Sequence, residues 1–258
     1  MTLNMTRHIL MLLLTVLCIV SPNVLQAEVI EVINESLPIQ ADELYQYSIS
    51  LLGLPAGTGT LQATHDRNSK GQTHLRLLCT AQSNDFISFF FPVNNLVDST
   101  IDTETLLPRH FLFQRREGSD HEDFDVTFHH ERQEVSIIKN GQLSTMYIPA
   151  ATHGPLSFLY YVRNVPHLTP GHSIRVDVHH DKKNYKIEIR TEEIERISGP
   201  WGEVEAIRFE AAMPFRGIFA NQGSFHFWLT NDRHRVPLMM QAKVIVGSAK
   251  AVLEGWTP

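Results

Sequence analysis

Short runs in which apolar and polar residues alternate recur along most of this 258-residue chain. A period of two places successive side chains on opposite faces of a β-strand. Turn formers such as the segment 53–57 and Asn140-Gly141 separate the runs. Many strands at short, even spacing predict an all-β domain. The runs cover residues 44–51, 57–64, 74–80, 110–115, 123–129, 134–139, 173–178, 185–191, 203–210, 223–229 and 238–253.

Two stretches carry helical signals instead. Residues 85–93 have Ser83, Asn84 or Asp85 available as a cap, and residues 155–162 begin with Pro155, which suits a first helical turn. Both stretches are short and apolar on nearly every side. We therefore expect each helix to plug the sheet or to lie against its concave face.

The chain shows no internal repeat, low-complexity tract or linker, which favours a single β-rich domain over residues 28–258. Two architectures fit the strand pattern. One is a single large antiparallel sheet, strongly curled into an open barrel or spiral, and the other is a β-sandwich. We predict an all-β fold with one or two short helices.

The first 27 residues have the organisation of an export signal. Arg7 precedes a twelve-residue apolar run at 9–20, which is too short to span a bilayer. A polar break at 21–23 follows, and the small Ala27 stands where a signal peptidase cleaves. We expect a signal peptide at 1–27 cleaved after Ala27, a periplasmic location, and no transmembrane segment in the mature chain.

Cleavage removes Cys18 and leaves Cys79 as the single cysteine of the mature chain, so no internal disulfide is expected. The neighbours Leu77 and Leu78 indicate that Cys79 is buried. A buried thiol behaves as a small apolar residue and is usually inert.

Acidic residues outnumber basic ones by 28 to 22, which gives a formal net charge of -6 at pH 7. Proteins that bind nucleic acid neutralise its phosphates with Lys and Arg. An acidic chain without a basic block is therefore not expected to bind nucleic acid. A hydrophobic fraction of 43% also excludes a disordered chain.

Familiar catalytic and metal-binding motifs are missing from the sequence: it has no His-Glu-x-x-His, paired-cysteine, nucleophile-elbow, phosphate-loop or dinucleotide pattern. The adjacent pairs His129-His130 and His179-His180 point to opposite faces of a strand, so neither pair chelates one ion. We therefore expect no metal, no cofactor and no enzymatic activity. A metal-dependent or other hydrolase is the least favoured alternative.

Large aromatic residues exceed what strand alternation needs, and they form three groups. If the helices lie in the mouth of a curved sheet, these rings line a cavity for an acyl chain or another apolar ligand. The alternative is that they form the core. The groups comprise Phe86, Phe89, Phe90 and Phe91, then Phe158, Tyr160 and Tyr161, and finally Phe215, Phe219, Phe225, Phe227 and Trp228.

A ligand site is predicted from six of these rings and one cation. Arg163 follows the second group, where it holds an anionic head group at the rim or pairs with Asp177 or Glu195. The predicted lining consists of Phe86, Phe89, Phe90, Tyr160, Tyr161 and Trp228.

Four segments of the chain resemble a known family when they are taken together. They are residues 42–58, the helix-like 156–163, the segment 228–238 with the sequence WLTNDRHRVPL, and the closing 244–253. In this combination the chain resembles domain-of-unknown-function family 3108 (DUF3108) over residues 42–253. The resemblance implies an exported protein with an open, spirally curled sheet, similar in shape to periplasmic lipoprotein carriers. It implies no established activity and no catalytic residues.

Two functional hypotheses follow. The first is a non-enzymatic, exported binding or chaperone-like protein that takes a lipid, an acyl chain or another apolar component of the cell envelope. The second is an interaction protein of an envelope assembly, joined to a protein partner by strand addition at an open sheet edge.

Overall fold

The computed structural model describes residues 42–67, 71–213, 223–244 and 247–258. The predicted signal peptide, Phe215 and Phe219 lie outside the described residues. Within them are two α-helices, α3 (Asp85–Phe90) and α4 (Pro155–Asn164), and a short 3-10 turn at His130–Arg132. The strands are β1 (Glu43–Leu51), β2 (Leu54–Arg67), β3 (Thr73–Ser83), β4 (Asn94–Asp102), β5 (Pro108–Glu117), β6 (Asp120–His129), β7 (Glu134–Lys139), β8 (Gln142–Tyr147), β9 (Ser173–His180), β10 (Lys183–Gly199), β11 (Gly202–Met213), β12 (Gly223–Thr230), β13 (Pro237–Val244) and β14 (Gly247–Thr257).

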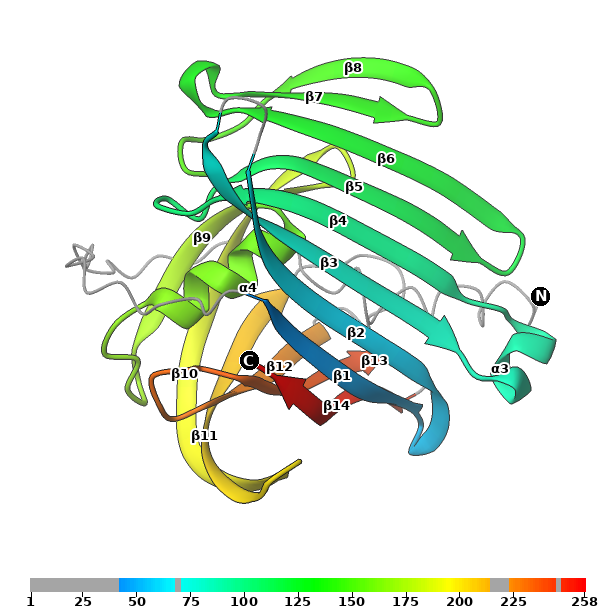
Figure 1. Ribbon diagram of the computed structural model, residues 1–258, viewed down its shortest axis with the longest axis vertical. Coiled ribbons are helices and arrows are strands. Elements are labelled where there is room, and N and C mark those ends of the chain that lie inside the picture. Colours follow the sequence, from blue (N-terminus) through cyan, green and yellow to red (C-terminus); the bar gives the residue numbers. More distant parts are fainter. Residues whose placement is uncertain (1–41, 68–70, 214–222, 245–246) are drawn as a thin grey trace.

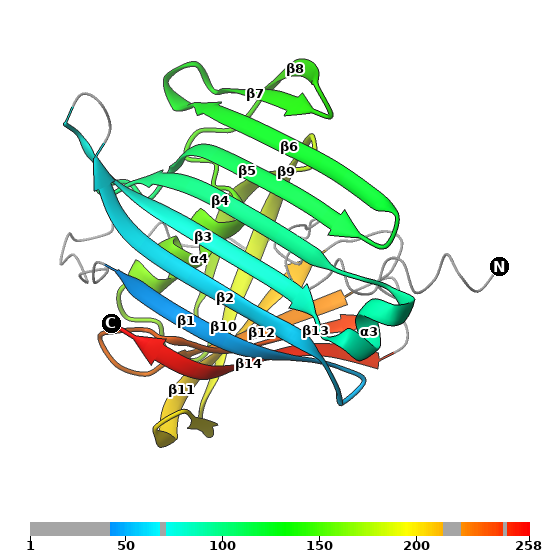
Figure 2. The same ribbon diagram turned by 45° about the vertical axis from the view of Figure 1, so that its right-hand side comes forward.

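All of these strands belong to one antiparallel sheet of 14 strands in the order β8-β7-β6-β5-β4-β3-β2-β1-β14-β13-β12-β11-β10-β9. Consecutive strands pair with each other throughout, except β8 and β9, and β1 also pairs with β14. The sheet curls strongly around α4 without closing, and β8 and β9 form its two edges (Figures 1 and 2). The predicted single curled sheet is confirmed, and the sandwich alternative does not hold.

The sequence pattern misses two strands and joins two others. In β4 the polar Asn95 and Ser99 are buried in phase with Val97 and Ile101, so the apolar period is hidden. In β8 an edge position leaves every residue at least partly exposed. The single run predicted at 238–253 is two strands, β13 and β14, that pair with each other.

The second predicted helix is confirmed as α4, which begins at Pro155 and continues to Asn164. It lies on the concave side of the sheet (Figure 1). Phe158, Tyr160 and Val162 are fully buried, and the Phe158 ring contacts Phe227 of β12 edge-on with 6.3 Å between ring centroids. The core therefore lies between α4 and the concave face.

The first predicted helix exists as α3, but its predicted burial is wrong. It has only six residues, none of them buried, and it lies at the opposite end of the sheet from α4 (Figures 1 and 2). The Asn84 side chain caps it by accepting a hydrogen bond from the Ile87 amide at 2.9 Å. Only Ile87 packs, partly buried, against the core.

The segment before α4 covers part of the β9 edge. His153 pairs with Val178 as an isolated parallel bridge: its amide donates to Asp177 O at 2.7 Å, and its carbonyl accepts from the His179 amide at 2.8 Å. The His153 ring is buried against Tyr161, with 4.8 Å between ring centroids. Burial, with the nearby His130, lowers the pKa of His153 to about 3.

We expect the buried His153 to make the protein less stable in mild acid. The unfolded chain takes up a proton at this histidine near pH 6.5, whereas the folded chain does so only near pH 3. Between these values the unfolded state binds more protons, so stability falls as pH falls. The loss for this one group is about 2 kcal/mol between pH 7.5 and pH 5.

Urea unfolding at the two pH values measures this loss. A His153→Asn variant will show a smaller difference between pH 7.5 and pH 5 than the wild type. The same substitution at the exposed His65 of β2 will leave the difference unchanged. Equal pH dependence in the wild type and His153→Asn would contradict the assignment.

Candidate functional site

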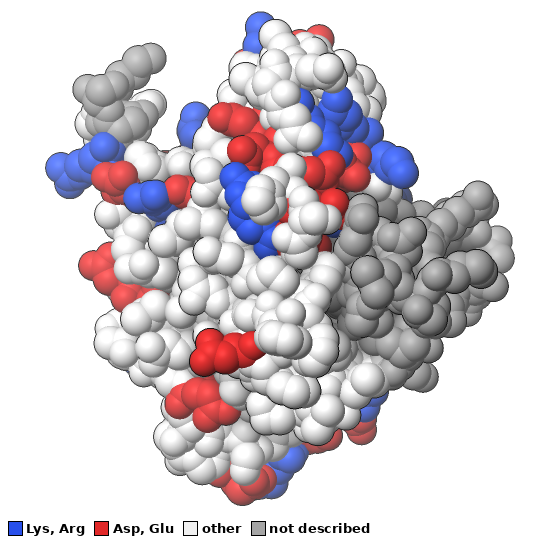
Figure 3. Space-filling view, turned by 90° about the vertical axis from the view of Figure 1, so that its right-hand side faces the viewer, with Lys and Arg blue, Asp and Glu red and all other residues white. Residues whose placement is uncertain are grey.

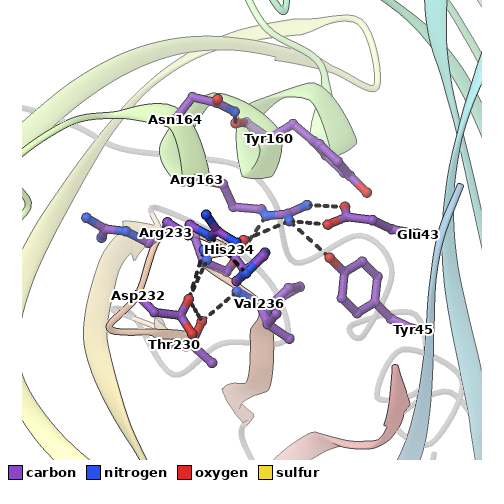
Figure 4. Close-up of polar contacts among 12 residues, drawn as sticks. Glu43, Tyr45, Tyr160, Arg163, Asn164, Thr230, Asp232, Arg233, His234 and Val236 are labelled. Atoms are coloured by element: carbon purple, nitrogen blue, oxygen red, sulfur yellow. Dashed lines mark hydrogen bonds and ion pairs between the residues drawn. The ribbon is translucent and has the colours of Figure 1, made fainter. Parts of the chain in front are cut away.

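The two ends of the concave face differ in chemistry, and the end at α4 holds a buried ion pair. Arg163 of α4 donates from Nη1 to Glu43 Oε2 at 3.0 Å and from Nη2 to Glu43 Oε1 at 2.9 Å (Figure 4). Its Nη2 also bonds to the Tyr45 hydroxyl at 3.0 Å. Arg163 is 4% exposed and Glu43 1% exposed, so the pair is removed from water.

The same guanidinium holds the connection between β12 and β13. Arg163 Nε donates to Arg235 O and its Nη2 donates to His234 O, both at 3.0 Å. The connection has its own bonds, because Asp232 Oδ1 accepts from the His234 amide at 2.9 Å. Segment 228–238 thus contains a loop whose backbone carbonyls, those of His234 and Arg235, bind Arg163.

The charges of this cluster are fixed by their surroundings. Burial alone would lower the pKa of Arg163, but Tyr45, Tyr160 and Glu43 reverse the direction and raise it. Burial raises the pKa of Tyr45. Arg163 therefore stays protonated and fully paired, and the cluster clamps α4 to β1 and to the β12–β13 connection.

Arg163 does not lie at a rim and pairs with neither Asp177 nor Glu195, contrary to the sequence-based expectation. Its partner, Glu43, was missed. The signal for Glu43 was its phase: it alternates with Tyr45, Tyr47 and Ile49 on the buried face of β1, where an unpaired carboxylate is costly.

The residues predicted to line one ligand site lie in three separate parts of the structure. Tyr160 is buried near Arg163, whose guanidinium carbon lies 4.9 Å from the centre of its ring, and Tyr161 is half-buried on His153. Trp228 lies on the convex face, because its neighbour Phe227 points inward, and its Nε1 donates to Glu195 Oε1 at 2.6 Å. The α3 residues Phe86, Phe89 and Phe90 lie at the far end and are exposed.

At the α3 end, small residues occupy neighbouring concave positions. A small, mostly apolar hollow of about 10 Å³, room for one water molecule, opens there between Ile49, Ala56, Ala81 and Val93. Gly57 belongs to the same hollow, and a Cβ at this position would lie 2.0 Å from Gln82 O, so β2 and β3 approach closely. Further along the concave face, the small side chains continue onto β11, β13 and β14 as Ala211, Ala242, Ala249 and Ala251.

A larger hollow of about 380 Å³ lies beside the base of α3 on the outer side. Its lining is mixed, with the polar Gln82, Ser88, Asn94, Arg116 and His121 beside Pro92 and Val93. None of the residues that line it is acidic.

A third hollow lies on the concave face beside the β9–β10 turn, between Phe111, Phe128 and His180. Burial lowers the pKa of His180 to about 4, so the ring is neutral at pH 7. Among the described residues, no group of three or more His, Cys, Asp or Glu is placed to hold a metal ion.

Cys79 packs against the core but is only partly buried, and desolvation raises the pKa of its thiol to about 12. Within the described ranges, no helix is long and apolar enough to cross a membrane.

A family model described as "Protein of unknown function (DUF3108)" matches residues 46–254. The chain belongs to the DUF3108 family. No curated protein matches the sequence of this DUF3108 chain.

Two solved structures are similar to this DUF3108 protein. One is a β-barrel-like protein of the domain of unknown function DUF1849 from Brucella abortus, at a TM-score of 0.55 and 9% identity, covering 84% of this chain and 97% of that one. This likeness shows the fold alone. The other is a Bacteroides fragilis protein with a YmcC-like fold, at a TM-score of 0.33 and 11% identity, covering 86% and 99% of the two chains. A TM-score this low carries no argument.

We expect loss of either partner of the buried ion pair to destabilise the fold by about 3–5 kcal/mol, because the remaining charge is left buried without compensation. Urea unfolding of Glu43→Leu and Arg163→Met measures this loss. The double variant will lose less than the sum of the two single variants.

A surface pair supplies the control. Arg76 and Asp98 have side chains that are 49% and 21% exposed, so Arg76→Met will cost no more than about 1 kcal/mol. Strict additivity of Glu43→Leu and Arg163→Met would show that the two side chains are not coupled.

Proposed function

We propose that this protein is a non-enzymatic, exported binding protein that takes the acyl chain of a lipid or a similar apolar group from the cell envelope. The observation that supports this most is the concave face at the α3 end. Ala56, Ala81 and Gly57 line a small apolar hollow there, which in this proposal widens to admit the chain, whereas α4 fills the other end. Apolar pockets with few polar groups are typical of lipid-binding sites.

The polarity of the concave face suits an amphipathic ligand. The strands β1 to β3 present apolar and small residues at this end, and β5 presents the buried Arg115 and Glu117. Arg115 is already paired, since its Nε donates to Glu117 Oε2 at 3.1 Å and its Nη1 to Glu122 Oε2 at 2.7 Å. The apolar residues of β1 to β3 would therefore supply the binding energy for a ligand. The ion-paired side chains of β5 would lie beside its polar part.

Export and a periplasmic location are part of the proposal and rest on the leader-like residues 1–27. An export signal places the protein among the membranes that supply acyl chains. Mature protein purified without detergent from the periplasm of its own host tests both parts: its N-terminus reports cleavage after Ala27, and native mass spectrometry with lipid extraction reports a bound ligand.

We expect Ala81→Phe to weaken the binding of the uncharged fluorescent probe N-phenyl-1-naphthylamine at least tenfold. Ala81 is buried on the concave face, and a phenyl ring there fills the apolar hollow. Titration of the probe by fluorescence measures the affinity. Gln62→Phe is the matched control, because it adds a ring to the convex face of β2.

Circular dichroism establishes that each variant is folded, and Ala56→Val serves as a milder change in the same hollow if Ala81→Phe does not fold. A probe that ignores the wild type, or that binds Ala81→Phe and Ala56→Val as well as the wild type, would overturn the proposal.

A second function is favoured by the edge strand β8. No described strand pairs with its outer edge, and its convex face carries the exposed Leu143 and Tyr147 beside Ile138 of β7. Such an edge suits strand addition by a protein partner. This alternative predicts a stoichiometric complex in crosslinked envelopes that is lost in Leu143→Lys, with no lipid copurifying.

A further inference from the structure

Five large apolar side chains are exposed together at the end of the sheet opposite α4. Phe86, Phe89 and Phe90 of α3 are 66%, 83% and 71% exposed. Leu52 and Leu54, from the adjacent β1–β2 turn, are also exposed. We call these five residues the apolar tip.

The two parts of the tip are held against each other. The Asn84 amide donates to Ala56 O, and Asn84 Nδ2 donates to Pro55 O, both at 2.9 Å. On the other side of α3, the Gly118 amide donates to Pro92 O at 2.7 Å. A Cβ at Gly118 would lie 2.8 Å from the ring of Phe91, so this hairpin packs closely against the end of the helix. The tip is therefore braced by the β1–β2 and β5–β6 hairpins.

The three phenylalanines are arranged as one outward surface. Their spacing of three and four residues places them on one side of the helix, while Ile87 turns toward the core. The Phe90 ring contacts Phe86 and Phe89 edge-on, with 5.7 and 5.0 Å between ring centroids. The rings thus form a preformed apolar projection rather than separate exposed side chains.

Leu52 is placed at a conformational cost. Its φ is +55°, and Gly53 follows with φ +80°, a turn in which Asn, Asp or Gly is favoured at the first position. A leucine in this left-handed conformation is strained, and its solvent-exposed side chain does nothing to stabilise the turn. Its position is explained if the side chain has a surface to contact.

Few charged residues lie around the tip, and the nearest is the exposed Asp85 in the first turn of α3. Residues 44–64 and 86–97 contain no Lys, Arg, Asp or Glu. Figure 3 faces this end of the molecule and shows charged side chains gathered toward its upper part, above a broad area that carries few charges. The outer hollow of about 380 Å³ adjoins the base of α3, and it contains Arg116 and His121 and no acid.

We propose that the apolar tip docks on the surface of a phospholipid bilayer, with the rings among the acyl chains and a lipid phosphate at the hollow of Arg116 and His121. The backbone of α3 suits this position, because Asn84 caps its first turn and the Phe91 amide bonds to Ile87 O. The hollow offers a phosphate the exposed His121 and the guanidinium of Arg116, which is shared with Asp123 and with the carbonyls of Arg115 and Glu122.

The composition of the tip favours a bilayer over a protein partner. At about 150–250 Å² for each ring, the exposed parts of the three phenylalanines offer roughly 330–550 Å², and the exposed parts of Leu52 and Leu54 add to this area. A typical protein interface also contains many polar groups and hydrogen bonds, whereas none of the five tip residues has a polar side chain. A compact, purely apolar projection needs no matching pocket in a bilayer.

Flotation with phosphatidylcholine vesicles tests the docking. We expect the mature wild-type protein to float with vesicles and the Phe89→Asp/Phe90→Asp double variant to lose at least tenfold in its partition coefficient. Leu143→Asp is the matched control, because Leu143 is equally exposed but lies on β8. Because the insertion is apolar and the chain is acidic, vesicles containing phosphatidylglycerol will bind no more tightly.

A tryptophan placed at the tip reports insertion directly. We expect Phe89→Trp to shift its emission to shorter wavelength with vesicles and to be quenched by brominated acyl chains. A wild type that does not float, or a double variant that floats equally well, would overturn the proposal. A dimer seen by light scattering and dissolved by Phe89→Asp/Phe90→Asp would overturn it in favour of an interface between copies.

This inference fails separately from the proposed function. Both substituted rings of the double variant lie outside the apolar hollow, so the variant will still bind N-phenyl-1-naphthylamine in solution. Vesicle binding without probe binding would reject the ligand site and keep the docking surface.

Discussion

The fold depends on a buried ion pair. The bidentate contact between Arg163 and Glu43 joins two parts of the chain that lie 120 residues apart in the sequence. Glu43 begins β1, the strand at which the two ends of the chain meet in the sheet, and Arg163 lies in the last turn of α4. The same guanidinium binds two carbonyls of the β12–β13 connection. One side chain therefore fixes the helix relative to both halves of the curled sheet.

A pair of this kind gives orientation more than net stability. Removing two charges from water costs several kcal/mol for each ion, and their attraction only offsets this cost when every donor and acceptor is used. Here Glu43 accepts with both oxygens, and Arg163 donates to the carboxylate, to Tyr45 and to two carbonyls. An apolar pair of similar volume would keep the packing of α4 but lose these directional bonds, which join the helix to β1 and to the β12–β13 connection.

Much of the fold was predictable because its core follows strand alternation. Tyr45, Tyr47 and Ile49 alternate as expected, and Pro155 marks the start of α4. Prediction failed where a buried position is polar, as at Asn95 and Ser99 of β4. The partner of Arg163 could not be found from spacing, because Glu43 lies 120 residues away and only the register of the completed sheet brings them together.

The predicted ligand site failed for a different reason. The prediction assumed that apolar helices are buried. This holds for α4, whereas no residue of α3 is buried. A six-residue helix has too little surface to bury one face and leave the rest polar, so composition alone cannot tell a plug from a projection. Trp228 was assigned to the wrong face of β12. Adjacent residues of a strand point to opposite faces, so Phe227 points inward and Trp228 faces the convex side, where it contacts Glu195.

The two ends of the sheet differ in how the chain is held. At the α4 end, one guanidinium joins the helix, β1 and the β12–β13 connection. At the α3 end, Gln82, Ser83 and Val93 line both the outer hollow and the apolar inner one. These three residues flank α3 in the chain, so the segment that carries the apolar tip also forms the wall between the two hollows.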